Sequence, residues 1–159
     1  MSMLERISRL VVGSSVATAH DAADVLRQCY VDCVTRARQL RRHADMAPQA
    51  HSVEGLTELA AAEEAQAERL RDALRAAGQA VPTVPSAALP SGALNHWARL
   101  VQDLETHRTS ARRLREFAVH FAETLPDTAT LFDDLCREEQ LHCERLRGLI
   151  ARADPQALD

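Results

Sequence analysis

Aromatic side chains are scarce in this chain and make up only 3% of its 159 residues. Proteins that bind single-stranded nucleic acids stack bases on such side chains, so this scarcity argues against a nucleic-acid partner. A run of arginines, Arg36, Arg38, Arg41 and Arg42, does form a basic patch. We interpret this patch as the solvated face of a helix rather than as a binding surface for a polyanion.

Long apolar runs are also missing, and no stretch is long enough to cross a bilayer. The segment 1–19 carries a short apolar core that faintly resembles a signal peptide, but Gly13, Ser14 and Ser15 interrupt it. An amphipathic lead-in helix is the better interpretation. We therefore expect no membrane association and a cytoplasmic location. In that compartment the four cysteines are free thiols or metal ligands rather than disulfides.

Glycine and proline are too few to interrupt the chain often, and Ala, Leu, Glu and Arg dominate a composition that is typical of helices. Pro48 and Gly78 are predicted helix ends, and three prolines make 79–92 an extended crossover. The sequence predicts a single all-α domain over 1–159, a four-helix bundle with one long crossover between the second and third helices. The expected helices are about 15–46, 52–77, 91–124 and 127–153, preceded by the short lead-in helix.

The fourth predicted helix carries two polar residues at positions where a bundle core is expected. Leu135, Glu139, His142, Leu146 and Leu149 follow one another at steps of four and three, which is the spacing of an inward-facing stripe. Burying an unpaired carboxylate is costly, so this stripe predicts a partner for the glutamate. The Glu-x-x-His spacing is also that of carboxylate-bridged metal sites in four-helix bundles.

The two halves of the chain resemble each other. Aligning Thr35 with Thr109 also aligns Leu26 with Leu100, and a second register aligns the ERLR segments after Glu63 and Glu139. The halves therefore read as two related helical hairpins with a pseudo-twofold axis. The repeat pairs six residues, all on the inward stripes: Glu63 with Glu139, Gln66 with His142, and Cys33 with His107.

At these residues the chain resembles the ferritin-like superfamily, in particular its rubrerythrin-like branch of small bacterial bundles. The resemblance rests on the segments AAEEAQAERL around Glu63, Asn95-His96-Trp97, Asp103-Leu104-Glu105 and Glu138-Glu139-Gln140-Leu141-His142. It implies a pair of irons bound by one Glu from each of the first and third helices and by Glu-x-x-His from the second and fourth. Glu139 and His142 match one Glu-x-x-His motif, and Glu63 matches the Glu of the other.

Three positions depart from the pattern of that family. Gln66 replaces the second His, Cys33 replaces the first-helix Glu, and His107 replaces the third-helix Glu. Glu105 competes for the last position, although the stripe favours His107. With only Glu63 and Glu139 left as carboxylates, the departures argue against a diiron pair and its ferroxidase or peroxidase chemistry.

The remaining donors predict a single transition-metal ion held by Cys33, His107 and His142, with Glu63 or Glu139 completing the ligand set. Thiolate with imidazole favours copper, then iron, with zinc as a third option. Two further residues belong to this hypothesis. Gln66 is expected to be a weak ligand or to hydrogen-bond a metal ligand, and Tyr30 is expected to lie beside the site.

Two functional classes follow, together with a metal-free alternative. One is a redox protein, an electron carrier or an oxidoreductase acting on a small-molecule oxidant, with a redox partner. The other stores, traffics or senses a metal without turnover. In the third, His107 simply bonds Glu139 in a metal-free structural bundle, and Cys33 is core filler. The resemblance to ferritin-like bundles also implies a possible homodimer.

Overall fold

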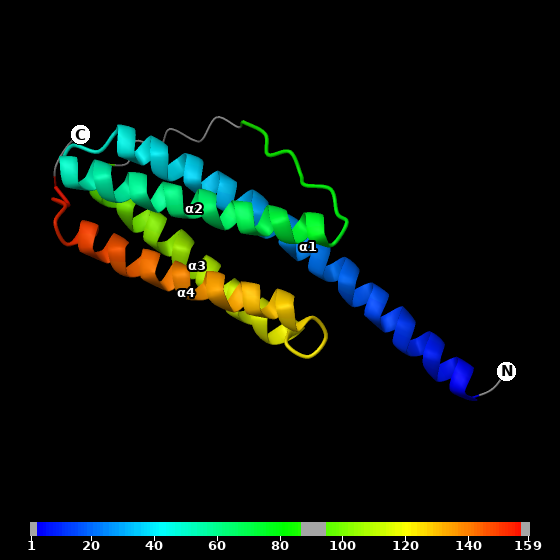
Figure 1. The fold of residues 1–159 in the computed structure, drawn as a ribbon. Coiled ribbons are helices and arrows are strands. Elements are labelled where there is room, and N and C mark those ends of the chain that lie inside the picture. The colour runs from blue at the N-terminus through cyan, green and yellow to red at the C-terminus, as the bar shows by residue number, and fades with distance from the viewer. Residues whose placement is uncertain (1–2, 87–94, 157–159) are drawn as a thin grey trace.

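The computed structural model describes residues 3–86 and 95–156, and it describes side chains from residue 21 onward. Four helices and no strand are present in these ranges (Figure 1). The helices are α1 (Met3–Asp45), α2 (Ala50–Ala76), α3 (His96–Phe121) and α4 (Pro126–Ile150). The predicted all-α four-helix bundle is therefore confirmed.

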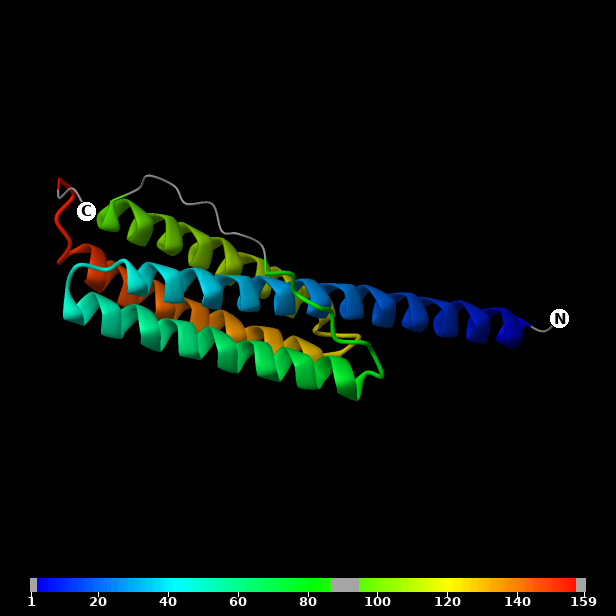
Figure 2. The same cartoon turned by 90° about the horizontal axis from the view of Figure 1, so that it is seen from above.

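The helices pack as two antiparallel hairpins, α1 with α2 and α3 with α4. The hairpins meet where α2 faces α4 and α1 faces α3. The described part of the crossover, 79–86, follows α2, and α2 and α3 run in the same direction (Figures 1 and 2). The guanidinium of Arg38 holds this crossover to α1 by donating to the carbonyl oxygens of Val84 at 3.3 Å and Pro85 at 2.8 Å.

Three of the helix ends have local causes in the sequence. Gly78 adopts φ 67°, and the backbone N–H of Gln79 donates to the carbonyl of Leu74 at 2.9 Å, which ends α2 close to where the glycine predicted. The Asn95 side chain accepts a hydrogen bond from the backbone N–H of Ala98 at 2.9 Å, so α3 begins later than the predicted residue 91. Pro126 occupies the first turn of α4.

The segment predicted as a separate lead-in helix is continuous with α1, which begins at Met3. No proline interrupts this stretch, and a single helical glycine costs only about 1 kcal/mol relative to alanine. The apolar positions assigned to its amphipathic face, among them Leu4 and Leu10, lie outside the described side chains.

The apolar core consists of two clusters separated by a polar layer. One cluster lies toward the α3–α4 turn and includes Leu26, Leu70, Phe121, Phe132 and Leu135. The other lies toward the α1–α2 turn and includes Leu40, Leu56, Leu100, Leu146 and Leu149. Burial of each such side chain is worth about 1.5–3 kcal/mol, so both clusters hold the helices firmly around the layer between them.

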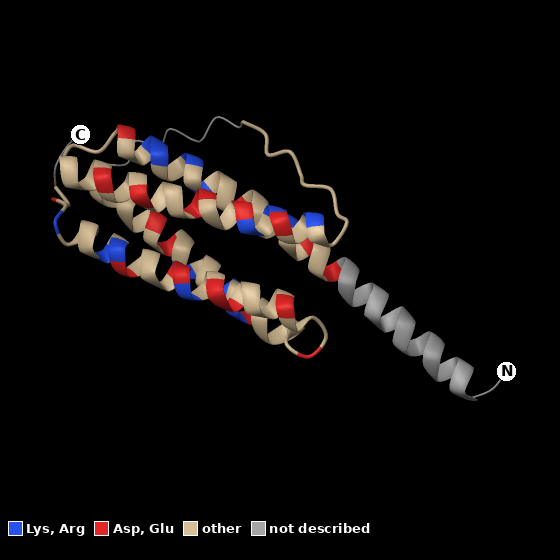
Figure 3. Ribbon diagram, viewed as in Figure 1, with Lys and Arg blue, Asp and Glu red and all other residues tan. Residues whose placement is uncertain are grey.

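Acidic and basic residues are interspersed along the described helices (Figure 3). Among the described residues, no helix combines the length and the hydropathy that a membrane crossing requires.

Candidate metal centre

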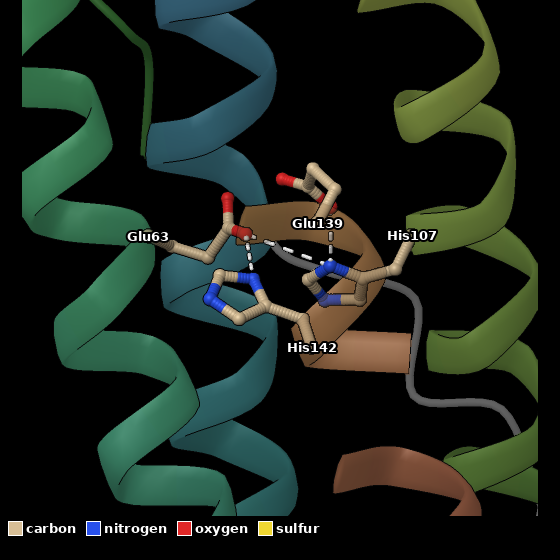
Figure 4. A group of neighbouring side chains, drawn as sticks. All are labelled: Glu63, His107, Glu139 and His142. Atoms are coloured by element: carbon tan, nitrogen blue, oxygen red, sulfur yellow. Dashed lines mark hydrogen bonds and ion pairs between the residues drawn. The ribbon is translucent and has the colours of Figure 1, made fainter. Parts of the chain in front are cut away.

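Four side chains that can bind a metal converge in the polar layer. Glu63 comes from α2, His107 from α3, and Glu139 and His142 from α4 (Figure 4). Each offers one ligand atom, and these atoms all lie within 4.8 Å of one another. The two carboxylates are completely buried, and the two imidazoles are 1% and 9% exposed. Core periodicity and the internal repeat had selected all four residues.

Each imidazole in the layer bonds a carboxylate. His107 Nδ1 lies 2.7 Å from Glu139 Oε2 and 3.5 Å from Glu63 Oε1. His142 Nδ1 lies 3.2 Å from Glu63 Oε1. The two rings meet edge to face, with their centroids 5.4 Å apart. An ionised carboxylate only accepts hydrogen bonds, so each Nδ1 is the donor in these pairs.

A fifth residue, Arg36 of α1, enters the layer and binds both carboxylates. Its Nε donates to Glu63 Oε2 at 2.9 Å, and its Nη2 donates to Glu139 Oε1 at 3.1 Å. The side chain is only 9% exposed. The assignment of Arg36 to a solvated basic face was therefore wrong. The signal that could have found it is its position three residues after Cys33, on the inward side of α1.

The charges of the layer are mutually stabilised. Burial alone would raise the pKa of Glu63, but the hydrogen bond with His142 and the charge of Arg36 lower it to about 2. Burial raises the pKa of Glu139, and the bond with His107 offsets this only in part. Burial alone would lower the pKa of His142, whereas its bond to Glu63 raises it. The layer therefore favours an ionised Glu63, which faces the guanidinium of Arg36 and the imidazoles of His107 and His142.

Cys33 lies next to the four converging residues but is not one of them. Its Sγ lies 3.3 Å from Arg36 Nη2, and its thiol donates to Gln66 Oε1 at 3.8 Å. Burial raises the pKa of this thiol well above its ordinary value, so the protonated form is favoured. In this arrangement Arg36 occupies the space through which the sulfur would approach the carboxylates. The role of Cys33 as a ligand stays a prediction.

The other residues of the sequence-based site have clear positions. Gln66 is buried and accepts the thiol bond of Cys33. Tyr30 is partly buried and packs against the apolar cluster toward the α3–α4 turn. Glu105 is exposed on α3 and pairs with Arg108 at 2.5 Å. His107 is thus the residue by which α3 contributes to the layer.

A second buried polar group was not expected from the sequence. His43 Nδ1 lies 2.7 Å from Asp103 Oδ2, and Gln39 Nε2 donates to Asp103 Oδ1 at 2.7 Å. His43 lies near the end of α1, yet it is only 7% exposed. This group ties α1 to α3 beyond the polar layer.

No family model matches the chain, and no curated protein matches it in sequence. Solved structures do match its fold. Mycobacterium tuberculosis bacterioferritin, BfrA, superposes with a TM-score of 0.73 over 83% of this chain and 85% of that chain, at 17% sequence identity. At this identity the match concerns the fold alone. The chain therefore has the ferritin-like four-helix fold.

The chemistry of the four converging residues fits a metal ion. Two carboxylates and two imidazoles are a suitable donor set for a divalent transition metal. The ferritin-like fold and the buried Glu, His, Glu, His group fit metal binding.

Proposed function

We propose that the protein binds a single redox-active transition-metal ion in the core of the bundle, through Glu63, His107, Glu139 and His142. The observation that carries the proposal is the convergence of their four ligand groups within 4.8 Å in a buried layer. Two completely buried carboxylates need positive partners, and a bound cation would add to the charge that Arg36 already supplies. The presence of the four ligand groups on three different helices supports a ligand that draws those helices together.

Iron is the metal we favour. The preference for copper depended on a thiolate ligand, and the sulfur of Cys33 faces Arg36 and Gln66. Carboxylate oxygens with imidazole nitrogens suit iron, with zinc as the redox-inert competitor. An ion bound there would supply one-electron chemistry, and the apolar clusters on both sides of the layer would restrict its access to water.

Arg36 supports a mononuclear site because it supplies a permanent positive charge beside the ion. The guanidinium stays protonated throughout the accessible pH range. It holds one oxygen of each carboxylate, and the other oxygens face the histidines. Arg36 is thus one cation that the chain itself supplies, and the remaining carboxylate oxygens and the imidazoles are donors for one metal ion.

A metal-free structural layer is the second candidate, and one observation favours it. Arg36, His107 and His142 already provide hydrogen-bond donors to both carboxylates. Because these hydrogen bonds satisfy both carboxylates, the layer is able to persist without an ion. Its net contribution to stability would then be small, since replacing buried ion pairs by apolar residues often leaves stability unchanged.

Elemental analysis of the full chain, expressed in turn with iron, copper and zinc, separates these candidates. We expect about one iron per chain that is lost in His107→Ala. The exposed histidine His120 on the same helix provides the matched control, and His120→Ala should keep the metal. Reversible one-electron oxidation of the iron-loaded protein would support the redox role. Two ions per chain would contradict the mononuclear proposal, and none under any condition would favour the structural layer.

A further inference from the structure

A cavity of about 490 Å³ lies between α1 and α3, on the side of the polar layer formed by Cys33 and Arg36. The two helices run alongside each other here (Figure 2). The volume of the cavity falls in the range of roughly 300–1,000 Å³ that is common for small-molecule sites. Half-buried and exposed residues form its mouth, and fully buried ones form its floor.

The inner wall of this cavity is apolar. Leu70, Leu114 and Leu135 are buried, Phe117 is half-buried, and the thiol of Cys29 lies beside them. Burial raises the pKa of Cys29 to about 12, so this sulfur presents a neutral surface. An apolar body of a ligand would therefore be favoured against this wall.

The mouth carries charges that balance one another. Arg113 pairs with Asp32 at 3.4 Å across the opening, and the cavity's other lining cation, Arg36, is held by Glu63 and Glu139. The remaining mouth residues include the uncharged Thr106 and Thr109 of α3, beside Glu105. No uncompensated positive or negative charge among the described lining residues therefore selects an ionic ligand.

The floor holds an unsatisfied hydrogen-bond donor. Gln66 is 1% exposed and lines the cavity, and its Oε1 accepts the thiol bond of Cys33. Its Nε2 is buried and has no hydrogen-bond partner among the described residues. A buried donor without an acceptor is unfavourable, and native proteins rarely leave one unpaired. A ligand oxygen inside the cavity would satisfy it.

We propose that this cavity binds an uncharged small molecule with an apolar body and a carbonyl oxygen. The oxygen accepts a hydrogen bond from Gln66 Nε2, and the body packs against Leu70, Leu114 and Phe117. Arg36 lines the cavity and also binds both carboxylates of the layer, so the bound molecule lies one side chain away from the candidate metal centre. Binding itself requires no metal.

Acetophenone and ethylbenzene test the proposal, because they share an apolar body and only the first has a carbonyl. Each is titrated into the metal-free full chain labelled with ¹⁵N, and dissociation constants are taken from chemical shifts. We expect acetophenone to bind about tenfold more tightly than ethylbenzene and to shift the side-chain amide signals of Gln66. In Gln66→Leu the difference between the two should fall to about twofold or less.

Two further variants locate the binding. Ser110 is half-buried and lines the cavity, whereas Leu141 is exposed on α4 outside it. Ser110→Phe should abolish binding of both compounds, and Leu141→Phe should leave it unchanged. Equal affinity for the two compounds in the unmodified chain, an unaffected Ser110→Phe variant, or no binding at all would overturn the proposal. Because the titration uses metal-free protein, these outcomes are independent of whether the layer binds an ion.

Discussion

Arg36 Nη2 donates to Glu139 Oε1 at 3.1 Å, and this bond joins residues 103 positions apart in the sequence. Arg36 belongs to the first hairpin and Glu139 to the second. The same guanidinium binds Glu63 within its own hairpin. One arginine therefore pairs with both carboxylates of the layer and links the two halves of the bundle.

Replacing Arg36 should destabilise the protein strongly. Arg36→Met removes the cation and leaves two buried carboxylates close together, and breaking a buried ion pair in this way costs about 3–5 kcal/mol. Urea denaturation of metal-free protein measures the loss. Arg137, an exposed arginine on α4, provides the matched control, and Arg137→Met should change stability by less than about 1 kcal/mol.

Metal should rescue the Arg36→Met variant more than the unmodified protein. A divalent ion supplies the positive charge that the variant lacks, and a ligand that binds only the folded state raises stability in proportion to the logarithm of its concentration. Thermal melting with and without iron measures the effect. Equal shifts in both proteins would show that Arg36 and the ion do not share the carboxylates.

Cys33→Ser should separate a thiolate ligand from a buried neutral thiol. If the four converging residues hold the ion, metal affinity should stay within about twofold, since the sulfur is hydrogen-bonded to Arg36 and Gln66 rather than to the four residues. Competition with a metal-binding dye measures that affinity. A loss of about tenfold or more would restore the sulfur-ligated site that the sequence predicted.

Alkaline pH should weaken the fold through Cys29. Burial, followed by the charge of Asp32, raises the pKa of this thiol from 9.0 to about 12. Above pH 9 the thiol of the unfolded chain therefore loses its proton, while the folded protein keeps it. The free energy of unfolding is unaffected by the titration of this thiol below pH 9 and declines above it. The free energy of unfolding should fall between pH 9 and 11, and it should fall less in Cys29→Ala. Parallel pH curves for the two proteins would contradict this.

Two glycines provide a matched pair of stability tests. Gly148 is exposed on α4 with open space at its Cβ position, so Gly148→Ala should stabilise the helix by about 0.5–1 kcal/mol. On α2, a Cβ at Gly55 would lie 3.1 Å from Leu149 Cδ2. Gly55→Ala should therefore gain less than Gly148→Ala, or lose stability, in urea denaturation. An equal gain would mean that α2 and α4 are able to separate at this point without cost.

The sequence was sufficient to predict the bundle and most of the polar layer. Helical periodicity placed Glu139 and His142 inside, and the internal repeat added Glu63 and His107. Both signals depend on regular spacing, which a repeating helix preserves. Both signals can be read from the sequence without knowing how the four helices pack against one another.

Arg36 escaped prediction because its neighbours are also charged. Arg36 lies three residues after the buried Cys33, but it belongs to a run with Arg38, Arg41 and Arg42 that we interpreted as a solvated face. A long flexible side chain also reaches the core from a position beside the stripe. His43 was missed for a related reason, since its burial depends on Asp103 of a distant helix. Partnerships of this kind become visible only when the helices are packed.

Because the residues of the polar layer come from both hairpins, the layer forms part of the interface between the two halves of the chain. Glu63 and Arg36 lie on one half, and His107, Glu139 and His142 lie on the other. If the crossover were nicked by a protease, the protein would become a two-fragment complex held by charge as well as by apolar contact. The affinity between the fragments would then vary with ionic conditions and metal supply, so fragment complementation would measure the strength of the layer directly.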